Sequence, residues 1–223
     1  MTQRAVVFDM YGTLLRIESV AAHAARAGAF DPDAFVAAWR ATQLRYSLLC
    51  TVADAYRPFD EITALALEQT LAESGLALKQ AQREALLQAW QSLPAYVDVA
   101  PALRALRQRG LATAVLTNGT RASATTLLER AGIHGLLDDV LSVEAVRVYK
   151  PHPRVYALAT ERFGCAPGAI VFVSSNGWDA WGGAHFGLDA VWCNRGGRPA
   201  EHLVPAARAA LGGLDELEAF IAG

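Results

Sequence analysis

Between Pro101 and Cys193 the chain alternates between segments with helical periodicity and short apolar segments typical of strands. The expected helices are 102–108, 122–131, 154–163 and 179–186, and the expected strands are 111–116, 139–142, 169–173 and 190–193. Such alternation is typical of β-α-β crossovers, which place strands side by side in a parallel sheet. The apolar run from Ala5 to Phe8 adds a first strand that is covered on both faces. The sequence therefore predicts an α/β fold with a Rossmann-like parallel sheet core flanked by helices.

Residues 15–97 separate this first strand from the alternating region and contain no convincing strand. The helix signals in the block are an N-cap at Asp31 or Asp33, an N-cap at Asp60, a stop at Gly75 and a helix from Lys79 to Trp90. We expect the block to form a helical-bundle cap inserted after the first strand, with residues 1–14 and 98–223 forming the core. The cap would fold over the strand ends and close a site between two lobes.

The composition excludes several classes of protein. With 53% hydrophobic and 19% charged residues in 223, the chain is expected to be compact. Its net charge of -2 provides no basic field for nucleic acid, and no run of about 18 apolar residues predicts a membrane span. The N-terminus leads into a strand without a secretory signal pattern, so we expect a cytoplasmic protein.

Cysteine and histidine usage gives no sign of a metal site or a disulfide framework. Cys50, Cys165 and Cys193 are scattered, and we interpret them as packing residues in preference to nucleophiles. The five histidines show no ligand spacing. We therefore expect no metal and no cofactor.

The first expected strand ends in an aspartate and a tight turn, Asp9-Met10-Tyr11-Gly12-Thr13. Open α/β sheets bind their ligands at the C-terminal ends of the strands, where this carboxylate would lie. Gly12 adopts backbone angles that other residues avoid, so the chain can turn sharply beside Asp9. We interpret Asp9 as a nucleophile, and the alternative is an aspartate that caps a turn or a helix.

Polar residues also lie in two loops that follow later expected strands. In a parallel sheet such loops meet at one edge. Thr117 and Asn118 begin an anion-binding turn, in which Thr117 or Thr120 could instead be an ordinary helix cap. Lys150 precedes Pro151 in a stiff loop. A lysine beside a buried carboxylate keeps it ionised at neutral pH, although most surface lysines have no such role.

The last cluster, residues 174–179, reads Ser-Ser-Asn-Gly-Trp-Asp. Asp179 would lie in the first turn of a helix, where the helix dipole stabilises negative charge. Capping by Ser175 or Asn176 is the simpler account of this cluster. It leaves Trp178 unexplained, because a large apolar side chain in the first turn is typical of a small-molecule pocket.

Together these four loops resemble the haloacid dehalogenase superfamily, and more narrowly its type II members, the L-2-haloacid dehalogenases. The resemblance covers nearly the whole chain and is carried by segments 8–14, 142–151 and 173–179. It implies a HAD-like fold, a homodimer, and hydrolysis of a small 2-haloacid with release of halide. The implied catalytic residues are Asp9, Thr13, Arg40, Thr117, Lys150, Tyr156, Ser174, Asn176 and Asp179.

The resemblance also implies roles for these residues. Asp9 would attack, Thr13 and Ser174 would hold its carboxylate, and Lys150 would supply the neutralising charge. Asp179 would orient Lys150 and the hydrolytic water. The remaining members of the polar shell would be Tyr156 and Asn176.

Substrate binding would involve both the core and the cap, through Met10, Tyr11, Arg40, Leu44, Phe59, Thr117, Asn118 and Trp178. By the resemblance, Thr117 would hold the substrate carboxylate, while Arg40, Asn118 and Trp178 would cradle the halide. Arg40 and Leu44 share a helix face, and a guanidinium on an apolar face has an anion to bind; the alternative is a surface arginine lying along the cap. Ala41 stands where relatives often carry a longer polar residue, which affects the range of substrate sizes.

Two alternatives belong to other functional classes. Phosphatases of the wider superfamily carry a second aspartate two residues after the nucleophile and hold magnesium with further carboxylates. Here Tyr11 occupies that position, and Ser174-Ser175 stand where those relatives carry Gly-Asp, so we expect attack at carbon. A catalytically idle scaffold is the other alternative, but a scaffold has no need of a charged cleft.

Overall fold

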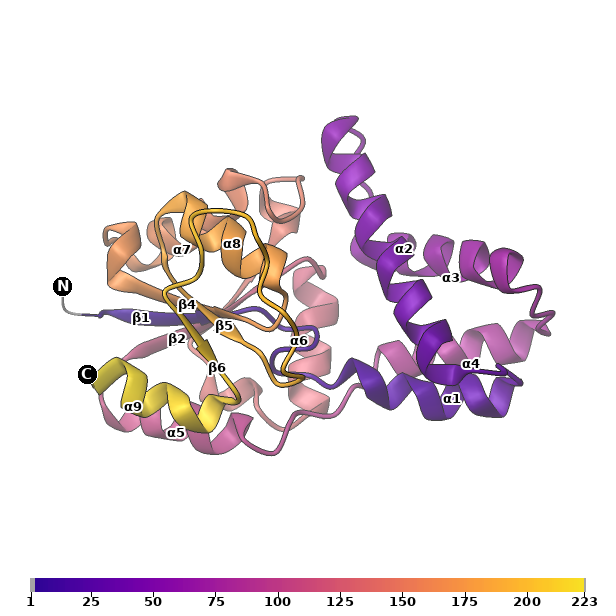
Figure 1. Ribbon diagram of the computed structural model, residues 1–223, viewed down its shortest axis with the longest axis horizontal. Coiled ribbons are helices and arrows are strands. Elements are labelled where there is room, and N and C mark those ends of the chain that lie inside the picture. The colour runs from indigo at the N-terminus through magenta and orange to yellow at the C-terminus, as the bar shows by residue number, and fades with distance from the viewer. Residues whose placement is uncertain (1–2, 223) are drawn as a thin grey trace.

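The computed structural model describes residues 3–222 as two lobes, a sheet-containing core and a helical cap (Figure 1). The core holds one six-stranded sheet in the order β3-β2-β1-β4-β5-β6, and every neighbouring pair is parallel. The strands are β1 (Ala5–Phe8), β2 (Ala112–Thr117), β3 (Asp139–Ser142), β4 (Ile170–Ser174), β5 (Asp189–Cys193) and β6 (Ala209–Leu211). This arrangement confirms the predicted α/β class and its parallel sheet.

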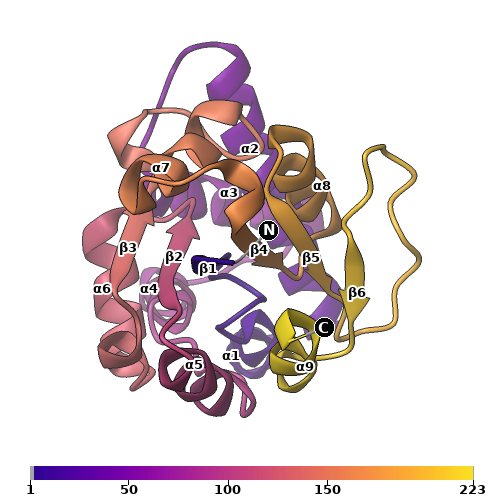
Figure 2. The same cartoon turned by 90° about the vertical axis from the view of Figure 1, so that its left-hand side faces the viewer.

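The central strand is β1, whose residues are all fully buried between β2 and β4. Helices cover both faces of the sheet, with α7 and α8 on one side and α5 and α9 on the other (Figures 1 and 2). The core helices are α5 (Val99–Gln108), α6 (Arg121–Arg130), α7 (Pro153–Phe163), α8 (Gly177–Phe186) and α9 (Leu217–Ala222). Short 3-10 turns are η2 (His134–Leu136), η3 (Val143–Ala145), η4 (Pro167–Ala169) and η5 (Leu214–Glu216). The sequence did not predict β6 or α9.

The cap contains η1 (Ile17–Val20), α1 (Ala21–Ala27), α2 (Pro32–Val52), α3 (Phe59–Ser74) and α4 (Gln80–Trp90). Asp31 is the N-cap of α2, where its carboxylate accepts a hydrogen bond from the amide of Ala34 at 3.0 Å. Gly75 ends α3 with a left-handed φ of 68°, as expected of a C-terminal glycine. Across the part of the chain that the structure describes, no helix is both long and apolar enough to cross a bilayer.

The predicted capping role of Asp60 is wrong. Pro58 is the N-cap of α3, and the Asp60 carboxylate instead accepts hydrogen bonds from Ser123 at 2.5 Å and from Thr120 at 3.4 Å. Both partners belong to the start of α6 in the core, so Asp60 fastens the cap to the core. The carboxylate therefore bonds to residues that are distant in sequence and does not cap its own helix.

The two connections between the lobes run side by side, because Leu15 bridges to Ala95. The amide of Arg16 donates to the carbonyl of Pro94 at 2.8 Å, and the amide of Tyr96 donates to the carbonyl of Leu14 at 3.0 Å. The chain therefore enters and leaves the cap directly beside the turn that follows β1.

Candidate functional site

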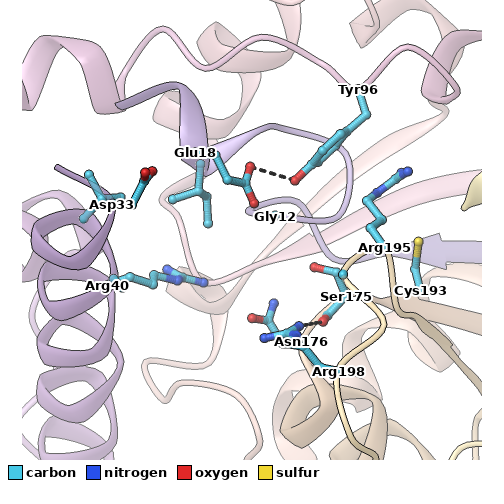
Figure 3. Close-up of a pocket in the computed structure, with 14 residues that line it drawn as sticks. Gly12, Glu18, Asp33, Arg40, Tyr96, Ser175, Asn176, Cys193, Arg195 and Arg198 are labelled. Atoms are coloured by element: carbon cyan, nitrogen blue, oxygen red, sulfur yellow. Dashed lines mark hydrogen bonds between the residues drawn. The ribbon is translucent and has the colours of Figure 1, made fainter. Parts of the chain in front are cut away.

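Two hollows open where α2 of the cap faces the core, and Arg40 and Asn176 line both of them. The first has a volume of about 420 Å³ and also reaches Gly12, Ser175 and Arg195 (Figure 3). The second has a volume of about 350 Å³, and the predicted substrate-binding residues Leu44 and Trp178 line it. Volumes of this size suit a small ligand.

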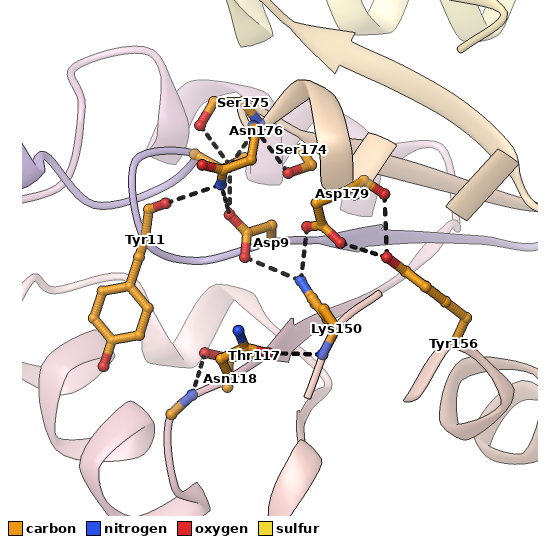
Figure 4. A network of polar contacts seen from close by, with 12 residues as sticks. Asp9, Tyr11, Thr117, Asn118, Lys150, Tyr156, Ser174, Ser175, Asn176 and Asp179 are labelled. Carbon is orange, nitrogen blue, oxygen red and sulfur yellow. Dashed lines mark hydrogen bonds and ion pairs between the residues drawn. The ribbon is translucent and has the colours of Figure 1, made fainter. Parts of the chain in front are cut away.

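Asp9 directly follows β1 and is only 5% exposed, and its amide donates to the carbonyl of Val173 on β4 at 2.9 Å. Its two carboxylate oxygens are both held by donors (Figure 4). The ammonium of Lys150 lies 3.0 Å from Oδ1, while Thr13 Oγ1 and Asn176 Nδ2 donate to Oδ2 at 2.9 and 3.0 Å. This arrangement fixes the orientation of the carboxylate.

Lys150 is 2% exposed and lies between two carboxylates, because its ammonium also donates to Asp179 Oδ2 at 2.9 Å. Burial disfavours the cation, but Asp179 and Asp9 outweigh burial and raise the pKa of Lys150. Burial also raises the pKa of Asp179, whose other oxygen accepts from the hydroxyl of Tyr156 at 2.7 Å. The structure therefore holds one buried cation with two buried carboxylates.

Ser174 does not make the contact with Asp9 that the family resemblance implies. Its hydroxyl accepts from the amide of Asn176 at 3.2 Å, and no hydrogen bond joins it to Asp9 within residues 3–222. Its neighbour Ser175 contacts the Asp9 carboxylate indirectly, because the amide of Ser175 donates at 2.8 Å to Thr13 Oγ1, which itself donates to Asp9. Asn176 is the N-cap of α8, yet its side chain bonds to Asp9 and makes no capping hydrogen bond.

Thr117 is the last residue of β2 and Asn118 follows it, and both are buried. The hydroxyl of Thr117 accepts from the amide of Gly119 at 3.0 Å, whereas Thr120 is the residue that caps α6. Asn118 Oδ1 accepts from the backbone amide of Lys150 at 3.2 Å. Asn118 thus positions the loop that carries the ammonium group.

Arg40 reaches toward the core from α2. Its Nη1 donates to Gln43 Oε1 at 2.5 Å, and its buried Nε has no hydrogen-bond partner among the described residues. Burial lowers the pKa of Arg40 from its ordinary value, and the nearby Asp9 opposes that effect. The group still carries its charge at neutral pH, because an arginine starts from a pKa above about 12. Arg40 lines both hollows, so its guanidinium can bind an anion there.

The sequence interpretation missed Gln43, which is fully buried and donates from Nε2 to Thr63 Oγ1 at 2.6 Å. Thr63 in turn donates to the carbonyl of Phe59 at 2.7 Å. A polar residue three positions after Arg40, on the same face of an apolar helix, was the available signal.

Tyr11 lies in a cluster of aromatic rings that joins core and cap. Its ring centroid is 5.5 Å from that of Phe59 and 6.1 Å from that of Trp90, and Trp90 is 5.2 Å from Trp39. The guanidinium carbon of Arg40 lies 5.7 Å from the centre of the Tyr11 ring. Burial raises the pKa of Tyr11, so its phenol stays neutral. Met10 and Phe59 are likewise fully buried, whereas Trp39 and Trp90 were not predicted to belong to this wall.

The donor set at Asp9 does not suit a metal ion. Within residues 3–222, no three His, Cys, Asp or Glu side chains are grouped so that they could hold one. The ammonium of Lys150 occupies the space between Asp9 and Asp179, where it forms an ion pair with each carboxylate. The three cysteines are unpaired, and burial raises the pKa of Cys193 to about 11, which keeps that residue a neutral thiol.

Comparison with known proteins places this geometry in a family. Residues 3–187 match the family model of the haloacid dehalogenase-like hydrolases. An (S)-2-haloacid dehalogenase from Pseudomonas sp. strain YL is 38% identical over 90% of this chain and 86% of its own. (S)-2-haloacid dehalogenase 1 from Pseudomonas sp. strain CBS-3 is 37% identical over 96% of this chain and 94% of its own.

Solved structures agree with these sequence matches. The L-2-haloacid dehalogenase RSc1362 superposes with a TM-score of 0.97 at 39% identity, covering 100% of both chains. An L-2-haloacid dehalogenase from Xanthobacter autotrophicus, solved with chloropropionic acid covalently bound, gives a TM-score of 0.91 at 33% identity over 100% of this chain and 99% of its own. The present chain belongs to the haloacid dehalogenase-like hydrolases.

Proposed function

We propose that this protein hydrolyses short L-2-haloalkanoic acids to 2-hydroxyalkanoic acids through an ester formed on Asp9. The observation that carries the proposal is a buried carboxylate paired with the Lys150 ammonium and held by Thr13 and Asn176, beside hollows that Arg40 of the cap lines. The relatives named as (S)-2-haloacid dehalogenases support it. So does the Xanthobacter relative, which was solved with chloropropionic acid covalently bound.

In the first step, a carboxylate oxygen of Asp9 attacks C2 of the substrate from the side opposite the halogen. The new C2–O bond forms as the carbon–halogen bond breaks, so C2 inverts and halide leaves with the bonding electrons. Thr13 and Asn176 fix the carboxylate in one orientation, which favours in-line displacement. Arg40 stabilises the developing halide charge. Halide needs no proton to leave, so the reaction needs no acid at position 11, where the related phosphatases carry an aspartate and this chain carries Tyr11.

In the second step, water attacks the carbonyl carbon of the Asp9 ester. The bond between that carbon and the oxygen that joins it to C2 breaks, and this oxygen takes up one proton of the water and leaves as the hydroxyl of the hydroxy acid. The other proton goes to solvent as the Asp9 carboxylate is restored. Asp179 can accept the proton of the water, because a carboxylate whose pKa is raised by burial is a stronger base than an exposed one. Lys150 donates to Asp9 Oδ1 and would stabilise the negative charge that develops on the Asp9 oxygens when water adds to the ester.

Halide release from a small panel of compounds tests the proposal. L-2-Chloropropionate should give chloride in excess chelator, and D-2-chloropropionate and p-nitrophenyl phosphate should be poor substrates. The Asp9→Asn variant is the matched control, since it keeps the size of the side chain. Turnover of the phosphate ester that requires magnesium, with no chloride from either haloacid, would replace this proposal with phosphatase activity.

We also propose a homodimer that forms through the cap. Leu48, Leu49, Val52 and Leu65 on α2 and α3 are exposed by 47%, 57%, 83% and 42%, a group of apolar side chains of the kind that marks an interface. A second copy of the chain would cover them. Light scattering should give the mass of two chains, and Val52→Glu with Leu49→Glu should give the mass of one; a wild-type monomer would end this proposal. A cytoplasmic location stays a prediction.

A further inference from the structure

Arg195 lies in the turn after β5 and connects two parts of the molecule that are distant in sequence. Its Nη1 donates to Asp98 Oδ2 at 2.5 Å, and its Nη2 donates to the backbone carbonyl of Thr13 at 3.2 Å. Its guanidinium carbon lies 4.2 Å from the centre of the Tyr96 ring (Figure 3). The side chain is 19% exposed, so these contacts are mostly shielded from water.

Arg208 shows what a comparable arginine does when it serves only as an ion pair. It makes a two-bond fork to Asp189, from Nε at 2.5 Å and from Nη2 at 2.8 Å, and stacks on Phe220 at 4.1 Å. Arg195 makes only one hydrogen bond to its aspartate. Its own Nε and Asp98 Oδ1 are buried without a partner among the described residues. Arg195 therefore does not form the stronger two-bond pair with its aspartate, and one of its N–H groups donates to the Thr13 carbonyl.

The Thr13 carbonyl belongs to the turn that holds the nucleophile. The side chain of the same residue is fully buried and donates to Asp9 Oδ2 at 2.9 Å. The amide of Ser175 fixes that hydroxyl from the other side at 2.8 Å. A shift of the Thr13 backbone would therefore move the donor that sets the angle of the Asp9 carboxylate.

The other end of Arg195 is anchored where the chain leaves the cap. Tyr96 and Asp98 lie between α4 of the cap and the body of α5, and the amide of Tyr96 donates to the carbonyl of Leu14. Asp98 Oδ2 also accepts from the amide of Leu214 at 2.8 Å, which ties it to the C-terminal part of the core. The anchor is thus fixed independently of Arg195.

We infer that Arg195 is a positioning residue that holds the Thr13 turn against the cap linker and so sets the attack angle of Asp9. Its hydrogen bonds go to Asp98 and to the Thr13 carbonyl, and none reaches Asp9 among the described residues, although its side chain also lines the first hollow. The inference rests on the proposed dehalogenation, because its consequence is the rate of the displacement at C2.

Rapid-quench measurement of the first turnover tests this inference, with halide release from L-2-chloropropionate as the signal. Arg195→Gln should slow ester formation by about 10- to 100-fold, the loss typical of a displacement of about 1 Å at a reacting group. Arg195→Lys keeps one donor and the charge, so it should recover part of that loss. KM should stay within about threefold, because the partners that Arg195 loses, Asp98 and the Thr13 carbonyl, are protein groups. Arg208→Gln is the matched control and should keep the wild-type burst.

The outcomes separate the two claims. A wild-type protein that releases no halide would contradict the proposed function. An active wild type, together with an Arg195→Gln variant as fast as Arg208→Gln, would overturn the positioning role. Where Arg195→Gln does not fold, Arg195→Lys and Asp98→Asn decide: slower bursts at unchanged KM support the role, and bursts equal to that of Arg208→Gln overturn it.

Discussion

The two sides of the Asp9 site differ in how completely their charges are partnered. On the core side, Asp9, Lys150 and Asp179 are at most 5% exposed, and every charged oxygen has a hydrogen-bond donor. On the cap side, Arg40 is only partly buried and its Nε has no partner among the described residues. The charges of the core side are therefore fully partnered within the protein, whereas the cap side has a charged donor without a partner.

The largest effect should come from removing the charge at the centre of the core side. Asp9→Asn should lower halide release by at least about 10⁴-fold, because a neutral amide cannot form the ester. Thermal unfolding should show that the variant is folded. Turnover near the wild-type rate in this variant would remove Asp9 from its role.

The next test breaks the core side without touching the nucleophile. Lys150→Met should leave two unpaired buried carboxylates, which lowers the unfolding free energy by about 3–5 kcal/mol and slows ester formation by about 10³-fold. Chemical denaturation and burst kinetics measure the two effects. Lys79→Met, at the exposed lysine before α4, is the control and should change neither.

On the cap side, loss of a ligand contact should reduce activity with little change in stability. Arg40→Gln should slow halide formation by about 10²-fold, since one charged donor is lost at the developing anion. Gln43→Leu should cost less, because Arg40 keeps its charge but loses its partner. The control is Arg45→Gln on the same helix, where the side chain is 54% exposed and pairs with Glu73. Equal losses in Arg40→Gln and Arg45→Gln would mean that the cap supplies no specific anion contact.

A smaller effect is expected at the ring that joins the two sides. Tyr11→Phe keeps the stacking on Phe59 and Trp90, so kcat should stay within about threefold of the wild type. A much larger loss in steady-state kinetics would show that the Tyr11 hydroxyl takes part in the reaction.

The smallest effect concerns pH. Asp179 and Asp9 raise the pKa of Lys150 against the effect of burial, so its cation should persist above the ordinary lysine value of about 10.4. The stability that this pair contributes is fully present below that value and is lost as the pH rises through the higher folded value. The burst rate should stay flat between about pH 7 and about pH 10. A fall in this interval that Lys150→Arg abolishes would contradict the assigned pKa direction.

Local signals pointed to Asp9 and to the polar cluster of the core side, whereas the roles of Tyr156, Asn176 and Asp179 came from the family resemblance. An apolar run that ends in Asp9, a glycine turn and the polar cluster at 174–179 are all readable from neighbouring residues. The choice between Ser174 and Ser175 was not, because it depends on which of two adjacent hydroxyls faces Thr13. The strand β6 is only three residues long, too short for a periodic pattern.

Contacts between the lobes were the least predictable part of the structure. Asp60 carries a plausible capping signal, and only the fold shows Ser123 beside it. Arg195 has no distinguishing neighbour in the sequence, since its partners Thr13 and Asp98 come from other parts of the chain. Such pairings arise from tertiary packing, which a single sequence does not encode as a local pattern.

The covalent step is the central claim, and one turnover in heavy-oxygen water tests it most directly. With enzyme in excess over L-2-chloropropionate, mass spectrometry of the peptide that contains Asp9 should show the label in its carboxylate. The hydroxyl oxygen of the product should then be unlabelled, because it comes from Asp9. Label in the product after the first turnover, with none in the protein, would show that water attacks C2 directly.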